Sequence, residues 1–336
     1  MLSIDDIRLA QERIRNSGCE DVIHTRMRSI PGVDDLLSAR VGRNVRVFFK
    51  CEHEQPVGSF KIRGALNFIL SCDEETRANG FVTHSSGNHG LAVAAAAQFV
   101  GTKAVIVVPR NAPAEKIALI AARGAEIVEC EPTLDARQAT CRELCTERHM
   151  TEIPPFNHLK TMAGQGTLGL EILEQVPDVD VVLAAVGGCG MISGIATAIK
   201  ASNSHVAIVG VEPAAVDDTI ESLKCGDLRG PSDPSRTTIC DALRVSPPGN
   251  LCFPIVQKLV DHILPVEDDQ VIDAMSYLWR FAEIVTEPSG ACSTAALFSN
   301  RFEILLRSNS QINTIVVIIC GCNVSQDYFV KLISCR

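Results

Sequence analysis

One lysine of this sequence lies where an amine could act as a nucleophile. Lys61 follows Gly58 and Ser59 in the segment GSFKIRGA (58–65), where an extended stretch gives way to a predicted helix. Backbone N–H groups at a helix start carry partial positive charge, which lowers the pKa of a nearby ammonium group. An amine with a lowered pKa can attack an aldehyde. An exposed lysine at a helix start explains this short motif equally well.

A second segment could bind a carboxylate. In THSSGNHGLA (83–92), a predicted strand runs into Ser-Ser-Gly-Asn-His-Gly and then into a predicted helix. Free N–H groups at the start of a helix, with hydroxyl and amide donors around them, suit a carboxylate. A helix capped by serine or asparagine is a common alternative explanation.

A glycine-rich segment could bind a phosphate. VGGCGMISG (186–194) again joins a predicted strand to a helix, and glycines let backbone N–H groups approach a phosphate closely. The dinucleotide pattern G-x-G-x-x-G is broken, because Ser193 stands at the third glycine position counted from Gly188. The segment therefore suits a single phosphate better than a nicotinamide dinucleotide.

Two acidic residues could hold a metal ion. Glu212 and Asp218 stand six residues apart after a predicted strand. Carboxylates together with a backbone carbonyl are ligands that a hard divalent cation prefers. On spacing alone, solvated acidic side chains explain the pair better.

These motifs lie at the ends of predicted strands in an α/β fold. Short runs rich in valine, isoleucine and alanine alternate with helical stretches, which is typical of a mostly parallel sheet covered on both faces. The expected strands are 45–52, 81–85, 103–108, 125–130, 179–186, 205–212 and 314–320, and the expected helices include 88–100, 113–122 and 164–176. The strands ending at Ser85, Val108 and Cys130 could form a smaller sheet of their own. Ligands in such folds bind at the carboxyl ends of strands.

The composition favours a cytoplasmic protein. The net charge is −9 at pH 7, and no basic stretch could neutralise nucleic-acid phosphates. The apolar runs are too short to cross a bilayer, and the amphipathic N-terminal segment lacks the apolar core of a secretory signal. The 14 cysteines include no C-x-x-C pair, so we expect mostly buried, reduced thiols. We expect neither nucleic acid nor a membrane as a partner.

Seven segments together resemble the fold type II pyridoxal-phosphate enzymes, and most of all their serine racemases and serine/threonine dehydratases. They occur in order between about Val45 and Val324 and are GSFKIRGA, HSSGNHG, AGQGT (163–167), VGGCGM, VEP, EPSGA (287–291) and CGCNV. The resemblance implies a large cofactor-binding domain, residues 1–78 and 159–336, and a small mobile domain, residues 79–158. Both would contain open twisted sheets, with the cofactor between them. It also implies pyridoxal 5'-phosphate as the cofactor, a small amino-acid substrate and a homodimer.

The resemblance assigns the residues that would bind the cofactor. Lys61 would carry it as a Schiff base, with Phe60 packed beside its ring. Asn88 would hydrogen-bond the ring hydroxyl, and Cys320 would face the pyridine nitrogen. Backbone N–H groups would surround the phosphate, from Gly187, Gly188, Cys189, Gly190 and Met191.

The resemblance also assigns a substrate site and a cation site. The loop that binds the substrate carboxylate would comprise Ser85, Ser86, Asn88 and His89, with Arg137 as a possible second partner. The divalent-cation site of serine racemases, for Mg²⁺ or Ca²⁺, would comprise Glu212, Asp218 and the carbonyl group of Val216.

The implied reaction begins when the freed Lys61 amine removes the Cα proton of the substrate. A neutral thiol at Cys320 cannot hold the ring nitrogen protonated, so the carbanion should be short-lived. It either loses a β-hydroxyl, which leads to a keto acid and ammonia, or takes a proton on the opposite face. In serine racemases the opposite-face acid is the second serine of the S-S-G-N-H loop, here Ser86. A structural hydroxyl at the helix start is the alternative role for Ser86.

The sequence also departs from these relatives. Cys189 replaces a glycine of the phosphate loop, where a side chain restricts positive φ. Pro56, Val57 and Leu91 stand where animal serine racemases have residues that help bind ATP, which argues against ATP as an activator. Val245 replaces a serine that helps hold the substrate, which would shift specificity or favour elimination. The chain leaves no room after its last strand for the C-terminal regulatory domain of biosynthetic threonine dehydratases.

Three functions are compatible with the sequence. The leading hypothesis is a serine racemase that also dehydrates serine to pyruvate and ammonia. The alternative is a dedicated ammonia-lyase that acts on L-serine, L-threonine or hydroxyaspartate. The third is a non-catalytic metabolite-binding protein on the same fold, against which intact Lys61 and Asn88 argue.

Overall fold

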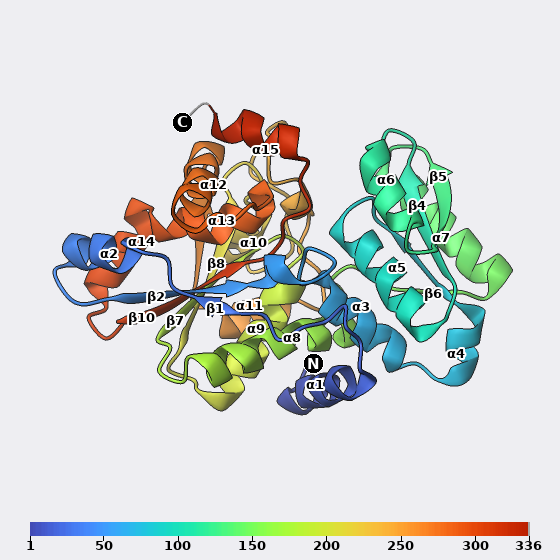
Figure 1. Cartoon of the computed structure of the whole chain (residues 1–336), viewed down its shortest axis with the longest axis horizontal. Helices are drawn as coiled ribbons and strands as arrows, with labels where there is room; N and C mark the ends of the chain where they lie inside the picture. The colour runs from blue at the N-terminus through green and yellow to red at the C-terminus, as the bar shows by residue number, and fades with distance from the viewer. Residues whose placement is uncertain (335–336) are drawn as a thin grey trace.

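The computed structural model describes residues 1–334 and contains two separate β-sheets, each with helices on both faces (Figure 1). This arrangement confirms the predicted α/β class. None of the described helices is both long and apolar enough to cross a membrane.

The larger sheet has six strands in the order β1-β2-β10-β7-β8-β9. They are β1 (Met27–Arg28), β2 (Arg46–Cys51), β7 (Val181–Ala185), β8 (Ala207–Pro213), β9 (His262–Val266) and β10 (Thr314–Ile319). All neighbouring strands run parallel except β1 and β2. Every residue of β7 and β10 is buried, because helices cover both faces of the sheet. This burial explains why the two strands are continuous apolar runs.

Helices form a layer on each side of the larger sheet. Below the sheet in Figure 1 lie α1 (Ile4–Ser17), α8 (Leu159–Gln175) and α9 (Gly190–Ser202), and above it lie α12 (Asp268–Ala282), α13 (Pro288–Leu297) and α15 (Gln326–Ile333). The remaining helices of this part are α2 (Val33–Val41), α3 (Lys61–Leu70), α10 (Asp218–Cys225), α11 (Phe253–Leu259) and α14 (Asn300–Ser308), with short 3₁₀ turns η1 (Glu52–Glu54) and η2 (Asp241–Leu243).

The smaller sheet has four parallel strands in the order β5-β4-β3-β6. They are β3 (Phe81–His84), β4 (Ala104–Pro109), β5 (Glu126–Cys130) and β6 (Thr151–Glu152), and the helices of this part are α4 (Glu74–Asn79), α5 (Asn88–Val100), α6 (Ala114–Ala121) and α7 (Leu134–Arg148). Alternate residues of β4 face opposite sides: Ile106 packs with α5 and α6, and Val107 packs with α7. The sheet lies within 79–158, and its motion as a small domain stays a prediction.

The carboxyl ends of β3, β7 and β10 are the places where the sequence motifs lie. The turn from β3 leads into α5, the turn from β7 leads into α9, and the end of β10 pairs with the segment that precedes α3 through a bridge between Ser59 and Gly321. The fold therefore brings motifs from distant parts of the chain to one region.

Candidate active site

Lys61 is the first residue of α3 and is partly buried. Its Nζ donates a hydrogen bond to the carbonyl oxygen of Pro155 at 2.8 Å and lies 5.2 Å from the centre of the Phe60 ring. Burial lowers the pKa of the Lys61 ammonium group to about 8. The pKa is lowered, as the sequence predicts, but the main cause is loss of solvent around the amine. A neutral amine, the form that attacks a carbonyl carbon, is thus accessible near neutral pH.

The segment before Lys61 is joined to the end of β10. Ser59 pairs with Gly321, and the Phe60 N–H donates to the carbonyl oxygen of Cys320 at 3.2 Å. These bonds place the lysine beside the residue predicted to face the pyridine nitrogen.

A buried network of charges fixes the first turn of α3. Arg63 donates to both carboxylate oxygens of Glu52, at 2.7 and 2.8 Å, and to those of Glu171, at 2.6 and 2.9 Å. The Lys50 Nζ donates to Glu171 at 2.6 Å. Two cations thus balance two carboxylates, and the network holds α3 against β2, η1 and α8.

The glycine-rich segment offers a set of free backbone donors. Within residues 1–334, the N–H groups of 187–191 donate no hydrogen bond to a protein acceptor. Gly190 and Met191 are the first two residues of α9, where N–H groups have no partner inside the helix. A Cβ at Gly188 would lie 2.5 Å from the Phe156 ring, and one at Gly190 would lie 2.7 Å from the Phe156 Cβ. These two positions therefore have room for glycine only. The loop is a suitable cradle for one phosphate group.

The backbone of Cys189 keeps the left-handed conformation in this loop although the residue has a side chain. Its backbone has φ +69° and ψ 1°, the left-handed conformation that glycine would adopt more easily. Its Sγ lies 3.7 Å from Oγ1 of Thr219, at the start of α10. The side chain therefore packs against α10, and the backbone takes the conformation that the glycine of relatives is expected to provide.

Cys320 follows the last residue of β10 and is buried. Its Sγ donates to the carbonyl oxygen of Ser289 at 3.4 Å, and burial raises the pKa of the thiol well above its usual range. The group is therefore a neutral thiol, as the sequence predicts.

The loop between β3 and α5 combines fixed and free donors. The Ser85 Oγ accepts a hydrogen bond from the backbone two residues on, at 3.3 Å, whereas the partly buried Ser86 hydroxyl bonds to no described residue. The Asn88 Nδ2 donates to Glu287 at 2.7 Å, and its Oδ1 accepts from Asn323 at 2.6 Å. Asn88 is thus held in one orientation and keeps one amide hydrogen for a ligand.

The imidazole of His89 does not extend into this loop. It is 3% exposed, and its Nε2 lies 2.9 Å from the carbonyl oxygen of Ile153. Burial lowers its pKa to about 3, so the ring is neutral. The predicted role of His89 in carboxylate binding stays a prediction, and its backbone N–H at the start of α5 is the group available for such contact.

Arg137 lies on α7, near the carboxyl end of β3. Its Nε donates to the carbonyl oxygen of Thr133 at 3.4 Å. The pKa of His84, the residue before Ser85, is lowered by burial and then by the positive charge of Arg137. The guanidinium group is thus close to the candidate carboxylate loop but makes no described contact with it.

The structure brings Glu212 and Asp218 together. Backbone N–H groups of Thr219 and Ile220 donate to the Glu212 carboxylate at 2.9 and 3.1 Å, and the buried Asp218 Oδ2 has no partner among the described residues. Burial raises the pKa of Glu212 to about 7, and burial followed by the Glu212 charge raises that of Asp218 to about 8. Val216 lies in the partly buried turn between them. An unpartnered carboxylate oxygen beside a second carboxylate suits a divalent cation.

Several residues around Lys61 were not predicted individually. Glu287 is 5% exposed, and burial raises the pKa of its carboxyl group to about 7. Asn323 also donates to the carbonyl oxygen of Val57 at 2.9 Å. Both residues lie inside motifs that the resemblance uses, EPSGA and CGCNV, so motif content was the available signal. Pro155 and Phe156 lie outside these motifs, and no pattern pointed to them.

The arrangement fits pyridoxal phosphate. It combines a cradle of N–H groups for the phosphate, an amine of lowered pKa and a fixed amide donor. The family model described as "Pyridoxal-phosphate dependent enzyme" matches residues 25–321. The chain belongs to the pyridoxal-phosphate-dependent enzymes. The family thus accounts for the order of the motifs along the chain.

Named relatives within this family include serine racemases and L-threonine ammonia-lyases. The chain is 41% identical over 267 residues to a serine racemase of Oryza sativa subsp. indica, covering 80% of this chain and 77% of the rice protein. It is 35% identical over 334 residues to an L-threonine ammonia-lyase of Thermotoga maritima, covering 99% of this chain and 79% of that protein. The solved structure of maize serine racemase superposes with a TM-score of 0.90 at 38% identity, over 98% of this chain and 96% of the maize chain.

Proposed function

We propose that this enzyme interconverts L-serine and D-serine and also converts serine to pyruvate and ammonia. One observation carries the proposal. The free Ser86 hydroxyl belongs to a loop that Asn88 ties, through Glu287 and Asn323, to the part of the molecule that carries Lys61. This link supports the proposal that the two groups that racemisation requires, a base and a second proton donor, act at one site.

Each residue has a defined task in this proposal. When bound, pyridoxal phosphate withdraws electrons from the substrate Cα and so acidifies its proton. Lys61 takes that proton, and Ser86 returns one to the opposite face. The N–H groups at the start of α5 and the Ser85 hydroxyl hold the substrate carboxylate. Neutral Cys320 leaves the ring nitrogen without a negative partner, which limits the lifetime of the carbanion.

A dedicated ammonia-lyase is the second candidate. Val245 offers no hydroxyl to the substrate in the loop that packs against Gly187 through Leu243. An apolar side chain there suits threonine as well as serine. The similarity to the Thermotoga ammonia-lyase over almost the whole chain also supports this candidate.

We propose further that Glu212, Asp218 and the Val216 carbonyl bind Mg²⁺ or Ca²⁺. The unpartnered Asp218 oxygen supports this site. A cation there would act on structure rather than on the reacting atoms, because it would join the end of β8 to the start of α10.

We propose that the enzyme is a cytoplasmic homodimer. Trp279, Phe281 and Val285 are 43%, 55% and 37% exposed at the end of α12 and just after it, which favours burial of this surface against a second copy. The described cysteines are all free thiols, as expected in a reducing compartment.

One assay separates the two catalytic candidates. L-serine is incubated with the enzyme and Mg²⁺, and D-serine and pyruvate are measured separately. The racemase proposal predicts D-serine from the first minutes, together with pyruvate. Abundant pyruvate without D-serine would establish the ammonia-lyase instead, and neither product would contradict both candidates.

A further inference from the structure

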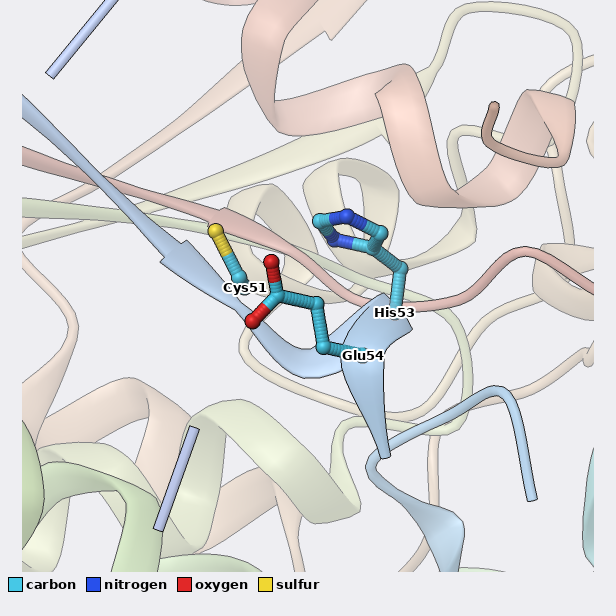
Figure 2. Close-up of side chains that lie close together, drawn as sticks. All are labelled: Cys51, His53 and Glu54. Atoms are coloured by element: carbon cyan, nitrogen blue, oxygen red, sulfur yellow. The ribbon is translucent and has the colours of Figure 1, made fainter. Parts of the chain in front are cut away.

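Three side chains with metal-binding atoms converge at the carboxyl end of β2. Cys51 is the last residue of the strand, and His53 and Glu54 belong to the following turn η1. A sulfur, an imidazole nitrogen and a carboxylate oxygen from the three residues lie within 4.8 Å of one another. In Figure 2 the thiol and the carboxylate lie next to each other, and the imidazole ring is turned toward them.

The local backbone explains why these side chains meet. Cys51 is the residue that opens η1, and Glu54 stands three positions later. Side chains three apart in a 3₁₀ turn lie over one another. The Glu54 side chain therefore lies over that of Cys51, and the His53 side chain lies close to both.

The His53 ring supplies a second observation that indicates a ligand. Its Nδ1 is buried and has no hydrogen-bond partner in the described part of the chain. Burial lowers the pKa of this imidazole to about 4, so the ring is neutral and carries a free lone pair. A buried nitrogen without a partner is unfavourable in the protein alone, and a bound metal ion would relieve that penalty.

The other two groups can become anionic ligands. Cys51 is fully buried, and burial raises the pKa of its thiol to about 12, so it is protonated without a metal. The Glu54 carboxylate is ionised and accepts two hydrogen bonds from Arg26, at 2.7 and 3.0 Å. The Arg26 side chain is 72% exposed, so it can turn away into solvent when a metal takes the carboxylate.

We propose that Cys51, His53 and Glu54 bind a zinc-type transition metal ion, with water as the fourth ligand. One thiolate, one imidazole and one carboxylate are donors that Zn²⁺ accepts in tetrahedral geometry. Binding forms a Zn–S bond and breaks the S–H bond of Cys51, whose proton leaves to the buffer. Magnesium and calcium do not suit this site, because they favour oxygen ligands only. The site is thus chemically distinct from the pair formed by Glu212 and Asp218.

Metal at this site would brace the turn that leads to the catalytic lysine. The carbonyl oxygen of His53 accepts a hydrogen bond from the Cys322 Sγ at 3.2 Å, and the Cys322 N–H donates to the Gly58 carbonyl oxygen at 2.9 Å. The turn η1 is therefore linked, through Cys322, to the segment that precedes Lys61. Zinc binding should raise the melting temperature of the holoenzyme.

Calorimetric titration with Zn²⁺ tests the proposal. The holoenzyme is treated with a chelator, returned to excess Mg²⁺ to saturate oxygen-rich sites, and titrated in two buffers of different protonation enthalpy. We expect one Zn²⁺ per chain and release of about one proton per ion, because the thiol must ionise.

Variants locate the ion. His53→Gln and Glu54→Gln alter partly exposed side chains, and each should weaken Zn²⁺ binding at least about 10-fold. Cys51→Ser should weaken it further and abolish the proton release. The matched controls His205→Gln and Cys225→Ser alter exposed residues and should bind Zn²⁺ like the original protein.

Two results would overturn the proposal. One is the absence of stoichiometric Zn²⁺ binding to the original protein. The other is unchanged affinity in the His53 and Glu54 variants, which would place the ion elsewhere. Co²⁺ gives an independent readout, because tetrahedral Co²⁺ absorbs in the red region of the spectrum, where the cofactor does not. That absorption should be lost in His53→Gln and kept in His205→Gln.

Discussion

Lys61 is the residue on which both proposed reactions depend. Lys61→Ala removes the base and the covalent attachment point of the cofactor, so racemisation and elimination should both fall by about 10³-fold or more. Turnover of L-serine and the absorption spectrum of the purified protein measure the two effects. Lys258→Ala, a change of an exposed lysine on α11, is the control. Substantial pyruvate production by Lys61→Ala would contradict the assignment.

At the scale of single residues, the sequence predicted chemistry better than side-chain direction. Lys61 and Asn88 were singled out from their motifs, and both lie in the candidate site. His89 was placed in the carboxylate loop from its motif, but the motif did not indicate that its imidazole is buried beside the Ile153 carbonyl group. A motif shows which residue begins a helix, but the direction of a side chain depends on what packs beneath it.

At the scale of helices and loops, the phosphate loop has no room for a side chain at Gly188. In Gly188→Ala the new Cβ would collide with the Phe156 ring, and the loop would have to shift. Overpacking of this kind costs about 1–3 kcal/mol. We expect at least about 10-fold weaker binding of pyridoxal phosphate. Titration of the apoenzyme, followed by fluorescence, measures this affinity.

Gly230→Ala is the matched control for the phosphate loop. The nearest atom to its new Cβ is Oγ of Ser246 at 3.7 Å, an ordinary contact. Affinity for the cofactor should not change in this variant. Equal affinity in Gly188→Ala and Gly230→Ala would show that the loop does not surround the phosphate.

The first turn of α3 depends on buried charge balance. Arg63→Met leaves Glu52 and Glu171 buried with only Lys50 as a cation, and removal of one partner from a buried network costs about 3–5 kcal/mol. Urea unfolding of the holoenzyme measures the loss. Arg15→Ala removes a pair with Glu174 in which both side chains are more than half exposed, and it should change stability little. Similar stabilities for both variants would contradict the role given to the network.

Strands and helices were predictable wherever the apolar pattern was strong. All seven expected strands are present within two residues of their predicted ends, and α5 spans the predicted range 88–100. The strand β9 was not predicted, because its run is short and contains Pro265, which an edge strand tolerates. The strands β1 and β6 have two residues each, too few to form a pattern.

For the whole molecule, the proposed cation site makes stability depend on pH. Without a cation, the raised pKa values of Glu212 and Asp218, about 7 and about 8, mean that the folded protein keeps protons that the unfolded chain releases above about pH 4. The free energy of unfolding should therefore fall as pH rises from about 5 to 8, by at least about 2 kcal/mol.

A divalent cation should cancel this dependence. Because Mg²⁺ or Ca²⁺ replaces the protons, its stabilising effect should grow with pH over the same range. Melting temperatures of chelator-treated protein, with and without the cation, test the expectation. Asp218→Asn should remove most of both effects. A cation effect that is independent of pH, or one that survives Asp218→Asn, would place the ion elsewhere.

For the whole molecule, contacts between segments that are distant in the sequence could not be predicted from the sequence alone. Periodicity indicated the parallel sheets, but no local signal connects Lys116 on α6 to Asp241 in η2, which form an ion pair at 3.1 Å between the two parts of the chain. The same holds for the bonds from Asn88 to Glu287 and Asn323. Such contacts depend on tertiary packing, and only the order of the motifs hinted at them.

The fate of the substrate Cα proton in Ser86→Ala tests the central claim most directly. L-serine is incubated in deuterated water with the original enzyme, Ser86→Ala and the exposed control Ser204→Ala, and D-serine and pyruvate are measured separately. We predict that Ser86→Ala lowers formation of deuterated D-serine at least about 100-fold, while pyruvate formation from L-serine changes by less than about 5-fold. An equal fall of both products, or D-serine formation that survives the substitution, would contradict the role of Ser86 as the second proton donor.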